Sequence, residues 1–412
     1  MDAVAVTGMG VFCSIGRDVA EFRQSLLAGR AGLSFALPFD ATRYRCRVAY
    51  PAPPPPQPAL VRRSAGVPRP ARVPRRLHTD VFKMARAALA EAVDSSRLPP
   101  PDLGAPDTAF IVATTLGHLV DMAGIAGRWA ARDLPARWPP STLLTFPIHA
   151  LMHMLAAEFG FAGRTDTVCS ACASGGAAIA LAVRLIQAGE AARAVVVGVE
   201  PLSEFAHAGF DALMLLDPAG CRPLCGDGTG LTLGAAAAAL VLEPLAAAQS
   251  RGAAVPATVA GIGMSCDAVH PAAPDPSGRG PVACLTAAAA EAGAGPAAIG
   301  YVNCHGTGTR YNDEVELAAL AAVFPAAENI VINSTKGLVG HTLGASGVIE
   351  ALVTVLALAD GLAHPNRIPG RRRIGPLSAP VAPERILAPV ALSNSFGLGG
   401  QNASIVIGRY AG

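Results

Sequence analysis

The order of two kinds of apolar segment limits what this chain can fold into. SGGAAIALAVRLIQAGE, which begins at Ser174, repeats its apolar residues at helical spacing, whereas ARAVVVGVEP, which begins at Ala192, is a short continuous apolar run. Such a run is typical of a strand that is buried on both faces. A further strand and a turn precede Ser174, so the order is strand, turn, helix, strand. This order predicts α/β architecture.

Segments of the same two kinds extend over residues 1–250. The spacing predicts strands at 3–16, 108–117 and 234–244 and helices at 18–32, 79–96 and 143–160. Thr79 provides a capping side chain for the second of these helices. The proline-rich segment from Pro51 to Arg76 has no hydrophobic periodicity, so we expect a long loop or an extended polyproline stretch there.

A second half begins near Ala254 and repeats this alternation. The spacing predicts strands at 257–267 and 329–335, a strand that ends in a glycine-rich turn at 299–309, helices at 280–293, 313–324 and 344–361, and two strands around a glycine turn at 388–407. Both halves place a polar residue on a turn between a strand and a helix. We therefore expect two halves of similar architecture, residues 1–250 and 251–412, although their residues show no repeat.

The charge and hydropathy of the chain argue against two classes of partner. The net charge of +2 and the pI near 8.1 provide no concentrated basic surface for nucleic acid, and proline interrupts the basic run from Arg62 to Arg76. No stretch reaches about 18 apolar residues without a charge, so we expect no membrane span. The first residues lack the cationic start of a secretion signal. These observations predict a cytoplasmic protein that binds neither nucleic acid nor a membrane.

Cys172 is the first candidate for chemistry. It follows a predicted strand and lies just before the helix that begins at Ser174, where the helix dipole favours a thiolate and predicts a lowered pKa. Free backbone amides at the same helix end could hold an oxyanion. Two alternatives stay open, a buried structural thiol and a zinc or disulfide site of Cys169 and Cys172 with Cys221 and Cys225. Cys169 is expected within the strand, which would keep the two sulfurs apart.

Two histidines lie beside glycines at the ends of predicted strands. His305 stands in NCHGTGT and His341 follows NSTKGLV, and a histidine in such a place faces a cleft more often than a core histidine does. A thiolate with two imidazole donors suits thioester exchange followed by carbanion chemistry. His149 and His153 have the spacing of metal ligands on a helix, but no third ligand is near, so we interpret them as helix-packing residues and expect no metal. Neither GMGVFCSIG nor GDGTG matches a nucleotide-binding motif.

Four motifs in the same order resemble those of the β-ketoacyl synthases, the condensing enzymes of fatty-acid and polyketide assembly in the thiolase superfamily. SACASGGAAI resembles the nucleophile motif, HGTGTRYNDEVE the first histidine motif, NSTKGLVGHTLGASGVIE the lysine and second histidine motif, and NSFGLGGQNASIVI the closing glycine turn. The resemblance covers nearly the whole chain. It implies a thiolase-like, duplicated five-layer α-β-α-β-α fold.

The resemblance implies an acyltransferase that carries out a decarboxylative Claisen condensation. Cys172 would accept an acyl group from an acyl carrier protein as a thioester. The amides of Cys172 and Phe396 would form the oxyanion hole, and Phe396 would also gate the pocket. His305 and His341 would bind the thioester carbonyl of a malonyl extender and stabilise the enolate formed as carbon dioxide leaves.

Further roles follow from the same resemblance. Lys336 would orient the site and pair with Glu316. Thr307 and Thr309 would hold the pantetheine arm, and Asp313 would be structural. No tightly bound cofactor is implied, because the phosphopantetheine arm arrives on the acyl carrier protein. The family pocket is built across a two-fold interface, which implies a homodimer or a heterodimer with a related ketosynthase-like subunit.

The chain departs from the family pattern in several places. Arg310 stands where the proline after the HGTGT turn is usual, Leu398 replaces the second aromatic residue of the closing turn, and Ala235 replaces an acid. The segment from Pro51 to Arg76 has no clear counterpart. These differences bear on substrate shape, pocket depth and the subunit contact, and they favour a specialised synthase over a housekeeping fatty-acid enzyme.

Two other functions fit the same fold. A chain-length factor pairs with a ketosynthase but lacks a working nucleophile, and the retention of Cys172, His305 and His341 argues against it. A non-decarboxylative acyltransferase or thiolase would carry a second cysteine as acid and base, and SFGLGG in the closing turn has none. The two histidines indicate decarboxylation.

Overall fold

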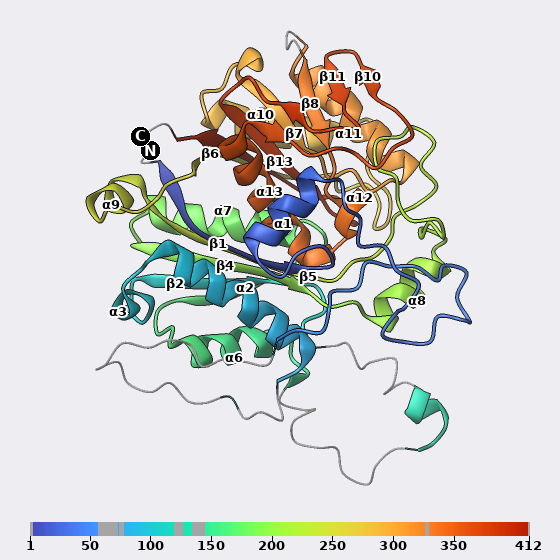
Figure 1. Ribbon diagram of the computed structural model, residues 1–412, viewed down its shortest axis with the longest axis horizontal. Helices are drawn as coiled ribbons and strands as arrows, with labels where there is room; N and C mark the ends of the chain where they lie inside the picture. The colour runs from blue at the N-terminus through green and yellow to red at the C-terminus, as the bar shows by residue number, and fades with distance from the viewer. Residues whose placement is uncertain are drawn as a thin grey trace.

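Strands and helices alternate through the first half of the chain in the computed structural model (Figure 1). The structure describes residues 3–56, 73, 78–118, 127–133, 145–325 and 329–410. The elements of this half are β1 (Val4–Cys13), α1 (Val19–Leu27), α2 (Asp80–Ser96), α3 (Pro100–Leu103), β2 (Thr108–Ala113), α6 (Ala150–Phe159), β3 (Thr165–Val168), α7 (Ser174–Gln187), β4 (Arg193–Glu200), α8 (Glu204–Ala212), β5 (Ala236–Pro244) and α9 (Leu245–Ser250).

The second half follows the same alternation and ends in short strands around two long ones. Its elements are β6 (Ala257–Cys266), α10 (Arg279–Glu291), η3 (Pro296–Ala298), β7 (Ile299–Asn303), α11 (Arg310–Val323), β8 (Ile330–Asn333), α12 (Lys336–Val339), η4 (Leu343–Ala345), α13 (Ser346–Asp360), β9 (Leu362–Ala363), β10 (Arg372–Ile374), β11 (Leu377–Ala379), β12 (Glu384–Arg385), β13 (Val390–Phe396) and β14 (Gln401–Arg409).

Each half contributes five strands in the same order and with the same directions. The order is β3-β2-β4-β5-β1 in the first half and β8-β7-β13-β14-β6 in the second. In each set the first three strands are parallel, and the last two pair antiparallel with their neighbours. β1 pairs with β6, which joins the sets into one sheet, and β11 and β10 extend the second set. The expected duplication is therefore confirmed as a repeat of topology.

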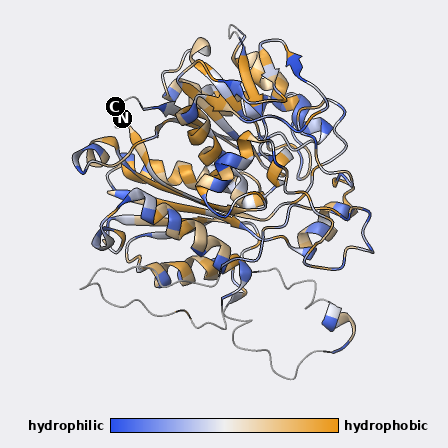
Figure 2. Cartoon of the chain, viewed as in Figure 1, coloured by the Kyte–Doolittle hydropathy of each residue, from blue (hydrophilic) through white to orange (hydrophobic). Residues whose placement is uncertain are grey.

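The elements form five layers. Helices α7 and α13 pack against each other between the two sets of strands, α2 and α6 cover the outer face of the first set, and α10 with α11 covers the outer face of the second (Figure 1). Figure 2 shows that the central helices and strands are predominantly hydrophobic. The residues of α13 are buried from Ser346 to Leu358, because strands lie on both sides of this helix. The α-β-α-β-α order agrees with the expected fold.

Several expected elements have different bounds in the structure, and the strand expected at 108–117, for example, ends at Ala113. The helix expected at 143–160 begins at Ala150, after a turn that includes Pro147, and proline cannot donate the backbone hydrogen bond of a helix interior. The segment 299–309 is a strand as far as Asn303 and then a glycine-rich turn, as expected. Helix α8 was not predicted. Most of the proline-rich segment, with its basic run, lies outside the described residues.

One segment qualifies the expectation about membrane spans. Leu343–Asp360 has 18 residues and a mean hydropathy of 1.7, which are sufficient in length and composition for a span. However, 89% of this segment is buried inside the protein, between the two sets of strands. A helix that is apolar all round and enclosed by protein is a core helix.

Candidate active site

One cavity collects the residues singled out in the sequence. It has a free volume of about 120 Å³, and its walls include Cys172, His305, His341, Phe396, Thr307 and Thr309. The histidine rings lie 5.4 Å apart between centroids and stand nearly perpendicular, at 81°. The first half of the chain thus supplies the thiol and the second half supplies the imidazoles.

Cys172 lies on a tight turn between β3 and α7. The preceding residue, Ala171, has a φ of 47°, a left-handed conformation that is unusual for a residue with a side chain. Ser174 stabilises this turn, because its hydroxyl donates to the Ala171 carbonyl at 2.6 Å and accepts from the Ser170 amide at 2.7 Å. Cys172 is only 5% exposed. The turn therefore holds the thiol at the start of α7 and within the cavity wall.

The expectation of a lowered thiol pKa is wrong. Burial raises the pKa of Cys172, although the Leu398 backbone amide and the positive charge of Lys336 act in the opposite direction. The physical reason is that desolvation of the thiolate outweighs the favourable dipoles and charge around it. Cys172 is therefore a protonated thiol at neutral pH when no substrate is bound.

The backbone amide that acts on the thiol belongs to Leu398, whereas the resemblance implied the Phe396 amide as the second donor of the oxyanion hole. Phe396 is the last residue of β13, and the turn that follows it approaches the nucleophile. A Cβ placed on Gly397 would lie 3.4 Å from the Ala173 nitrogen. The Phe396 ring instead lies 6.2 Å from the His305 ring.

The cysteine pair does not form a metal or disulfide site. All nine cysteines are free thiols. Cys169 is exposed and lies just after β3, not within it as expected, whereas Cys172 is buried. Within the described ranges no group of three histidine, cysteine or acidic side chains is arranged to hold a metal ion.

His305 lies on the turn after β7, where the carboxylate of Glu316 holds the backbone. The amides of His305 and Gly306 each donate to Glu316 at 2.8 Å, and the Asn394 side chain donates at 3.1 Å. Burial raises the pKa of Glu316 to about 7, against the effect of these donors. Glu316 thus fixes the position of the histidine through its main chain.

Lys336 pairs with Glu350, and the expected pairing with Glu316 is wrong. The Lys336 ammonium lies 2.5 Å from the Glu350 carboxylate, and both side chains are 1% exposed. The same ammonium donates to the His305 carbonyl at 2.5 Å and lies 3.1 Å from His305 Nδ1. Burial raises the pKa of Glu350 to about 7. Glu316 is occupied by backbone amides, so the acid from α13 is the partner of the lysine.

The two imidazoles are neutral, and both present the same nitrogen as a donor. Burial lowers the pKa of His305 and of His341 well below the ordinary value, and the charge of Lys336 adds to this effect. His305 Nδ1 faces the Lys336 ammonium, and His341 Nδ1 accepts from the Leu343 amide at 3.2 Å. A neutral imidazole whose Nδ1 accepts must carry its proton on Nε2. The pair therefore offers two uncharged N–H donors.

Two other predicted residues, Thr307 and Thr309, lie on the turn that follows His305, and a third, Asp313, lies in the first turn of α11. The hydroxyls of Thr307 and Thr309 are 2.8 Å apart, and both residues line the cavity. Asp313 accepts from the amides of Leu224 at 2.8 Å and Gly308 at 3.2 Å. Asp313 therefore fixes the glycine-rich turn and does not face the cavity.

Sequence reasoning missed two residues of this site. Glu350 is the one charged residue among the buried residues of the apolar helix α13, and a lone acid inside such a helix is a sequence signal for a buried partner. Leu398 acts through its backbone amide, which no side-chain pattern identifies.

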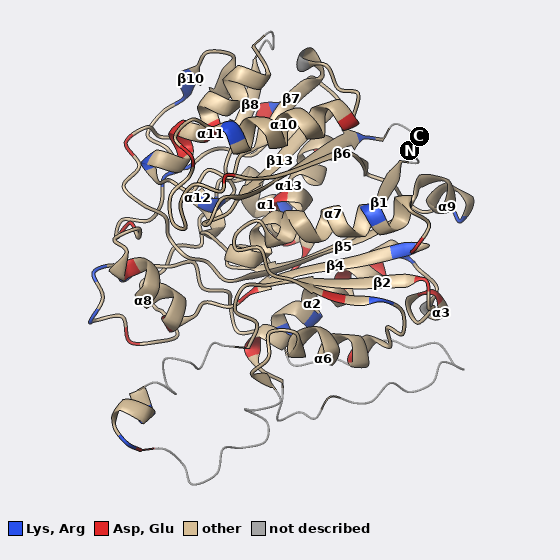
Figure 3. Cartoon of the chain, turned by 180° about the vertical axis from the view of Figure 1, so that it is seen from behind, with Lys and Arg blue, Asp and Glu red and all other residues tan. Residues whose placement is uncertain are grey.

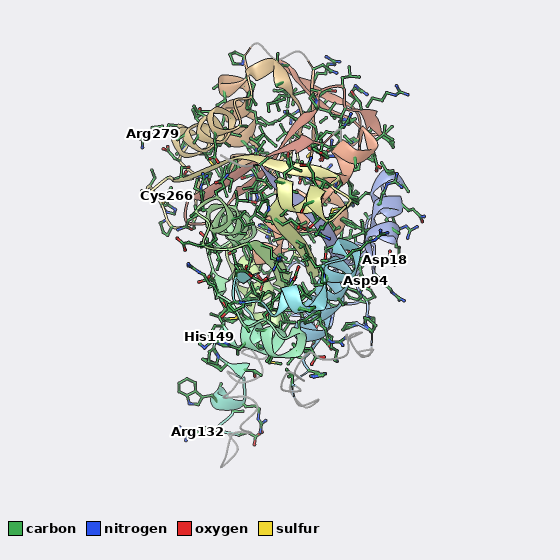
Figure 4. All side chains as sticks on the ribbon, turned by 90° about the vertical axis from the view of Figure 1, so that its left-hand side faces the viewer. Asp18, Asp94, Arg132, His149, Cys266 and Arg279 are labelled. Atoms are coloured by element: carbon green, nitrogen blue, oxygen red, sulfur yellow. The ribbon has the colours of Figure 1, made fainter. Side chains whose placement is uncertain are left out.

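Elsewhere among the described residues, two histidines that had the spacing of metal ligands lie apart from this cavity. His149 and His153 are exposed and lie 5.3 Å apart between ring centroids, so they are not the packing residues expected of them. Figure 4 shows His149 and Cys266 at the outer surface. Figure 3 shows charges of both signs interspersed over the described part of the chain.

Known proteins with similar sequences share this arrangement of domains. Residues 1–248 match the N-terminal domain of β-ketoacyl synthases, and residues 256–368 match the C-terminal domain. A 3-oxoacyl-[acyl-carrier-protein] synthase 2 from Synechocystis is 30% identical to this chain, over 99% of this chain and 98% of that protein.

Solved structures show the same likeness. The ishigamide ketosynthase/chain length factor has a TM-score of 0.90 and 30% identity, with full coverage of both chains. A chain of the structure described as the ketosynthase ApeO in complex with its chain length factor ApeC from Xenorhabdus doucetiae has a TM-score of 0.81 and 27% identity, over 99% of this chain and 98% of that chain.

Proposed function

The chain belongs to the β-ketoacyl synthase family, and we propose from this premise how its cavity performs the condensation reaction of such enzymes. The protein is an acyltransferase of the ketosynthase type, which acts in fatty-acid or polyketide synthesis. The observation that carries the assignment of residues is the cavity shared by Cys172, His305 and His341. The role of each residue below is our proposal.

The first step is the transfer of an acyl group to Cys172. The sulfur attacks the thioester carbonyl of an acyl carrier protein, the new carbon–sulfur bond forms, and the carrier thiol leaves with the proton. The amides of Cys172 and Leu398 are the donors for the oxyanion of this step, because the Leu398 amide already faces the sulfur. Phe396 was expected to supply that second amide, and we retain only its role in the cavity wall.

The second step uses the two neutral imidazoles. Nε2–H of His305 and of His341 donate to the thioester carbonyl of a malonyl extender, and carbon dioxide leaves as the carbonyl becomes an enolate. Neutral donors suit this step because they stabilise an enolate oxygen without carrying a ready acid proton to its carbon. The enolate carbon then bonds to the acyl carbon, and the thiolate of Cys172 leaves and regains a proton.

The carrier protein reaches this cavity through its phosphopantetheine arm. Thr307 and Thr309 line the cavity with paired hydroxyls and are the residues that we propose contact the arm. Leu398, which is 37% exposed, lies at the same wall, so the departure from an aromatic residue leaves a smaller side chain there. No tightly bound cofactor is part of this proposal.

A second ketosynthase-like subunit is the proposed structural partner. Strand β3 forms the end of the sheet and is hydrogen-bonded on one side only, to β2, within the described residues. Two similar solved structures are described as ketosynthases with a chain length factor. We propose that the complex acts in the cytoplasm, and native mass measurement of the purified complex distinguishes an identical partner from a related one.

Replacement of the nucleophile tests the assignment. Cys172→Ala should abolish acylation, seen by intact-mass spectrometry, and should spare malonyl decarboxylation at least in part. His305→Ala should impair decarboxylation. Cys169→Ala is the matched control, because it removes an exposed thiol three residues away and should acylate normally. Acylation of the Cys172→Ala variant at another position in the cavity would place the nucleophile elsewhere.

The acylation and decarboxylation assays also distinguish the proposed function from the two competing functions. A chain-length factor would show no acylation of the wild-type protein, and a thiolase would transfer acyl groups without release of carbon dioxide. Both outcomes are visible in the same two assays.

A further inference from the structure

The carboxylate of Glu200 lies at the end of β4, outside the cavity wall, and binds five donors. It is 0% exposed. One oxygen accepts from the Leu116 amide at 2.9 Å and the Thr114 hydroxyl at 3.3 Å. The other accepts from the Thr115 amide at 2.8 Å, the Thr115 hydroxyl at 2.6 Å and the Gly344 amide at 2.9 Å.

The Gly344 contact connects Glu200 to the second histidine. Gly344 follows Leu343, which has a φ of 44° and is therefore held in the left-handed region that a leucine rarely adopts. The Leu343 amide donates to His341 Nδ1 at 3.2 Å, and the Ser346 hydroxyl lies 3.1 Å from the same nitrogen. Of these two groups only the amide must be a donor, because a hydroxyl can also accept. A strained residue of this kind persists only when its surroundings fix it, and the next amide along the chain is bound to a fully buried carboxylate.

We propose that Glu200 is a positioning residue that sets the tautomer of His341. By holding the Gly344 amide, it keeps Leu343 left-handed, and the Leu343 amide then keeps Nδ1 of His341 as an acceptor. The imidazole proton consequently stays on Nε2, where the proposed function requires a donor. This inference rests on the proposed function of His341 in the condensation.

The contacts of Glu200 fit this role better than a purely structural one. The first three of its donor residues lie on the turn after β2, and Gly344 is on the far side, in the η4 turn before α13. The two segments approach so closely that residue 344 has no space for a side chain. A Cβ on Gly344 would lie 2.8 Å from the Glu200 carboxylate and 2.7 Å from Thr114 Cα. Glu200 therefore clamps the η4 turn to the first half of the chain.

Glu200→Gln tests the proposal, because the amide keeps the shape of the side chain but replaces one acceptor oxygen with a donor. We expect kcat for malonyl decarboxylation to fall roughly tenfold to a hundredfold, as when a residue that orients a metal-binding histidine is lost, with little change in KM. Nitrogen-15 NMR of histidine-labelled protein should show the wild-type Nε2–H tautomer of His341 and a mixture in the variant. The resonance that disappears in the His341→Gln variant is assigned to His341.

A matched control separates positioning from general stability. Glu91 also accepts two backbone amides, from Val11 at 2.9 Å and Val19 at 2.7 Å, and it does not line the cavity. Glu91→Gln should lower the melting temperature and leave kcat unchanged. If Glu200→Gln preserves both kcat and the tautomer, the proposal is wrong. If the wild-type protein does not decarboxylate malonyl thioester, the proposed function fails instead.

A double-mutant cycle tests the route through Leu343. Glycine adopts a φ of 44° readily, so Glu200→Gln should reduce kcat less in a Leu343→Gly background than in the wild-type background. Melting temperatures confirm that each variant is folded. If a variant that contains Leu343→Gly does not fold, the His341 tautomer measured by NMR in the single Glu200→Gln variant still tests the proposal. Equal losses of kcat in both backgrounds would show that Glu200 does not act through Leu343.

Discussion

A Cβ placed on Gly347 would lie 2.3 Å from the backbone nitrogen of Gly176. Helices α7 and α13 therefore meet backbone to backbone near their N-terminal ends. Cys172 lies just before the first of these helices and His341 just before the second. This contact is what brings the thiol and an imidazole from separate halves of the chain into one cavity.

Gly347→Ala should therefore lower the free energy of unfolding by about 3 kcal/mol or more, since the added carbon meets backbone atoms that cannot rotate away. Chemical denaturation measures the change. Gly209→Ala is the control, because a Cβ there has no neighbour within 4 Å and α8 should gain up to about 1 kcal/mol. If the Gly347→Ala variant has the same free energy of unfolding as the wild type, the two helices can move apart to accept the added carbon.

Replacing one member of the buried pair of Lys336 and Glu350 should destabilise the protein more than replacing both. Lys336→Met leaves an unpaired buried carboxylate, so unfolding should become easier by about 3–5 kcal/mol. Adding Glu350→Gln should recover part of this loss, as seen in denaturant unfolding. Glu316→Gln is the comparison, since its coupling with Lys336→Met should be smaller. Equal coupling energies would contradict the pairing that the structure shows.

Alkylation of Cys172 should report a raised pKa. Because burial keeps the pKa of this thiol above its ordinary value, its rate of reaction with iodoacetamide should keep rising with pH through about 8.5, where a free cysteine is half ionised. Intact-mass spectrometry measures the modification, and Cys172→Ala shows the background from other thiols. A rate that levels off below neutral pH would indicate a preformed thiolate.

Glu316 should make the folded state less stable as the pH rises. In the unfolded chain its carboxyl ionises near pH 4.3, whereas burial holds the folded pKa at about 7. The folded state therefore binds the extra proton between these values. Stability is highest below the unfolded pKa, falls as the pH rises between the two values, and has lost about 4 kcal/mol once the pH passes the folded pKa.

Denaturation of the wild type and Glu316→Gln at several pH values from 4 to 8 measures this effect. The glutamine variant should lose the part of the pH dependence that Glu316 causes, while Glu350, whose pKa is also raised to about 7, retains its own part. Identical pH slopes for the two proteins would mean that Glu316 is ionised throughout.

The local pattern of the chain was sufficient for the elements and for the position of the nucleophile. The helix from Ser174 and the strands on either side follow from apolar spacing, which acts over a few residues. The same spacing placed Cys172 on a turn at a helix start. It could not fix the start of α6 or predict α8, in which only His207 is buried, because loops and exposed helices depend on what they pack against.

What the sequence determined by itself is the set of chemical groups and the turns that carry them: Cys172, His305, His341 and Lys336. Only the tertiary structure decided that Lys336 meets Glu350, that the Leu398 amide faces the thiol, and that the thiol pKa is raised. The reason is physical. A pairing across the fold and the desolvation of a charge depend on every segment that packs around a group, and these segments come from distant parts of the chain.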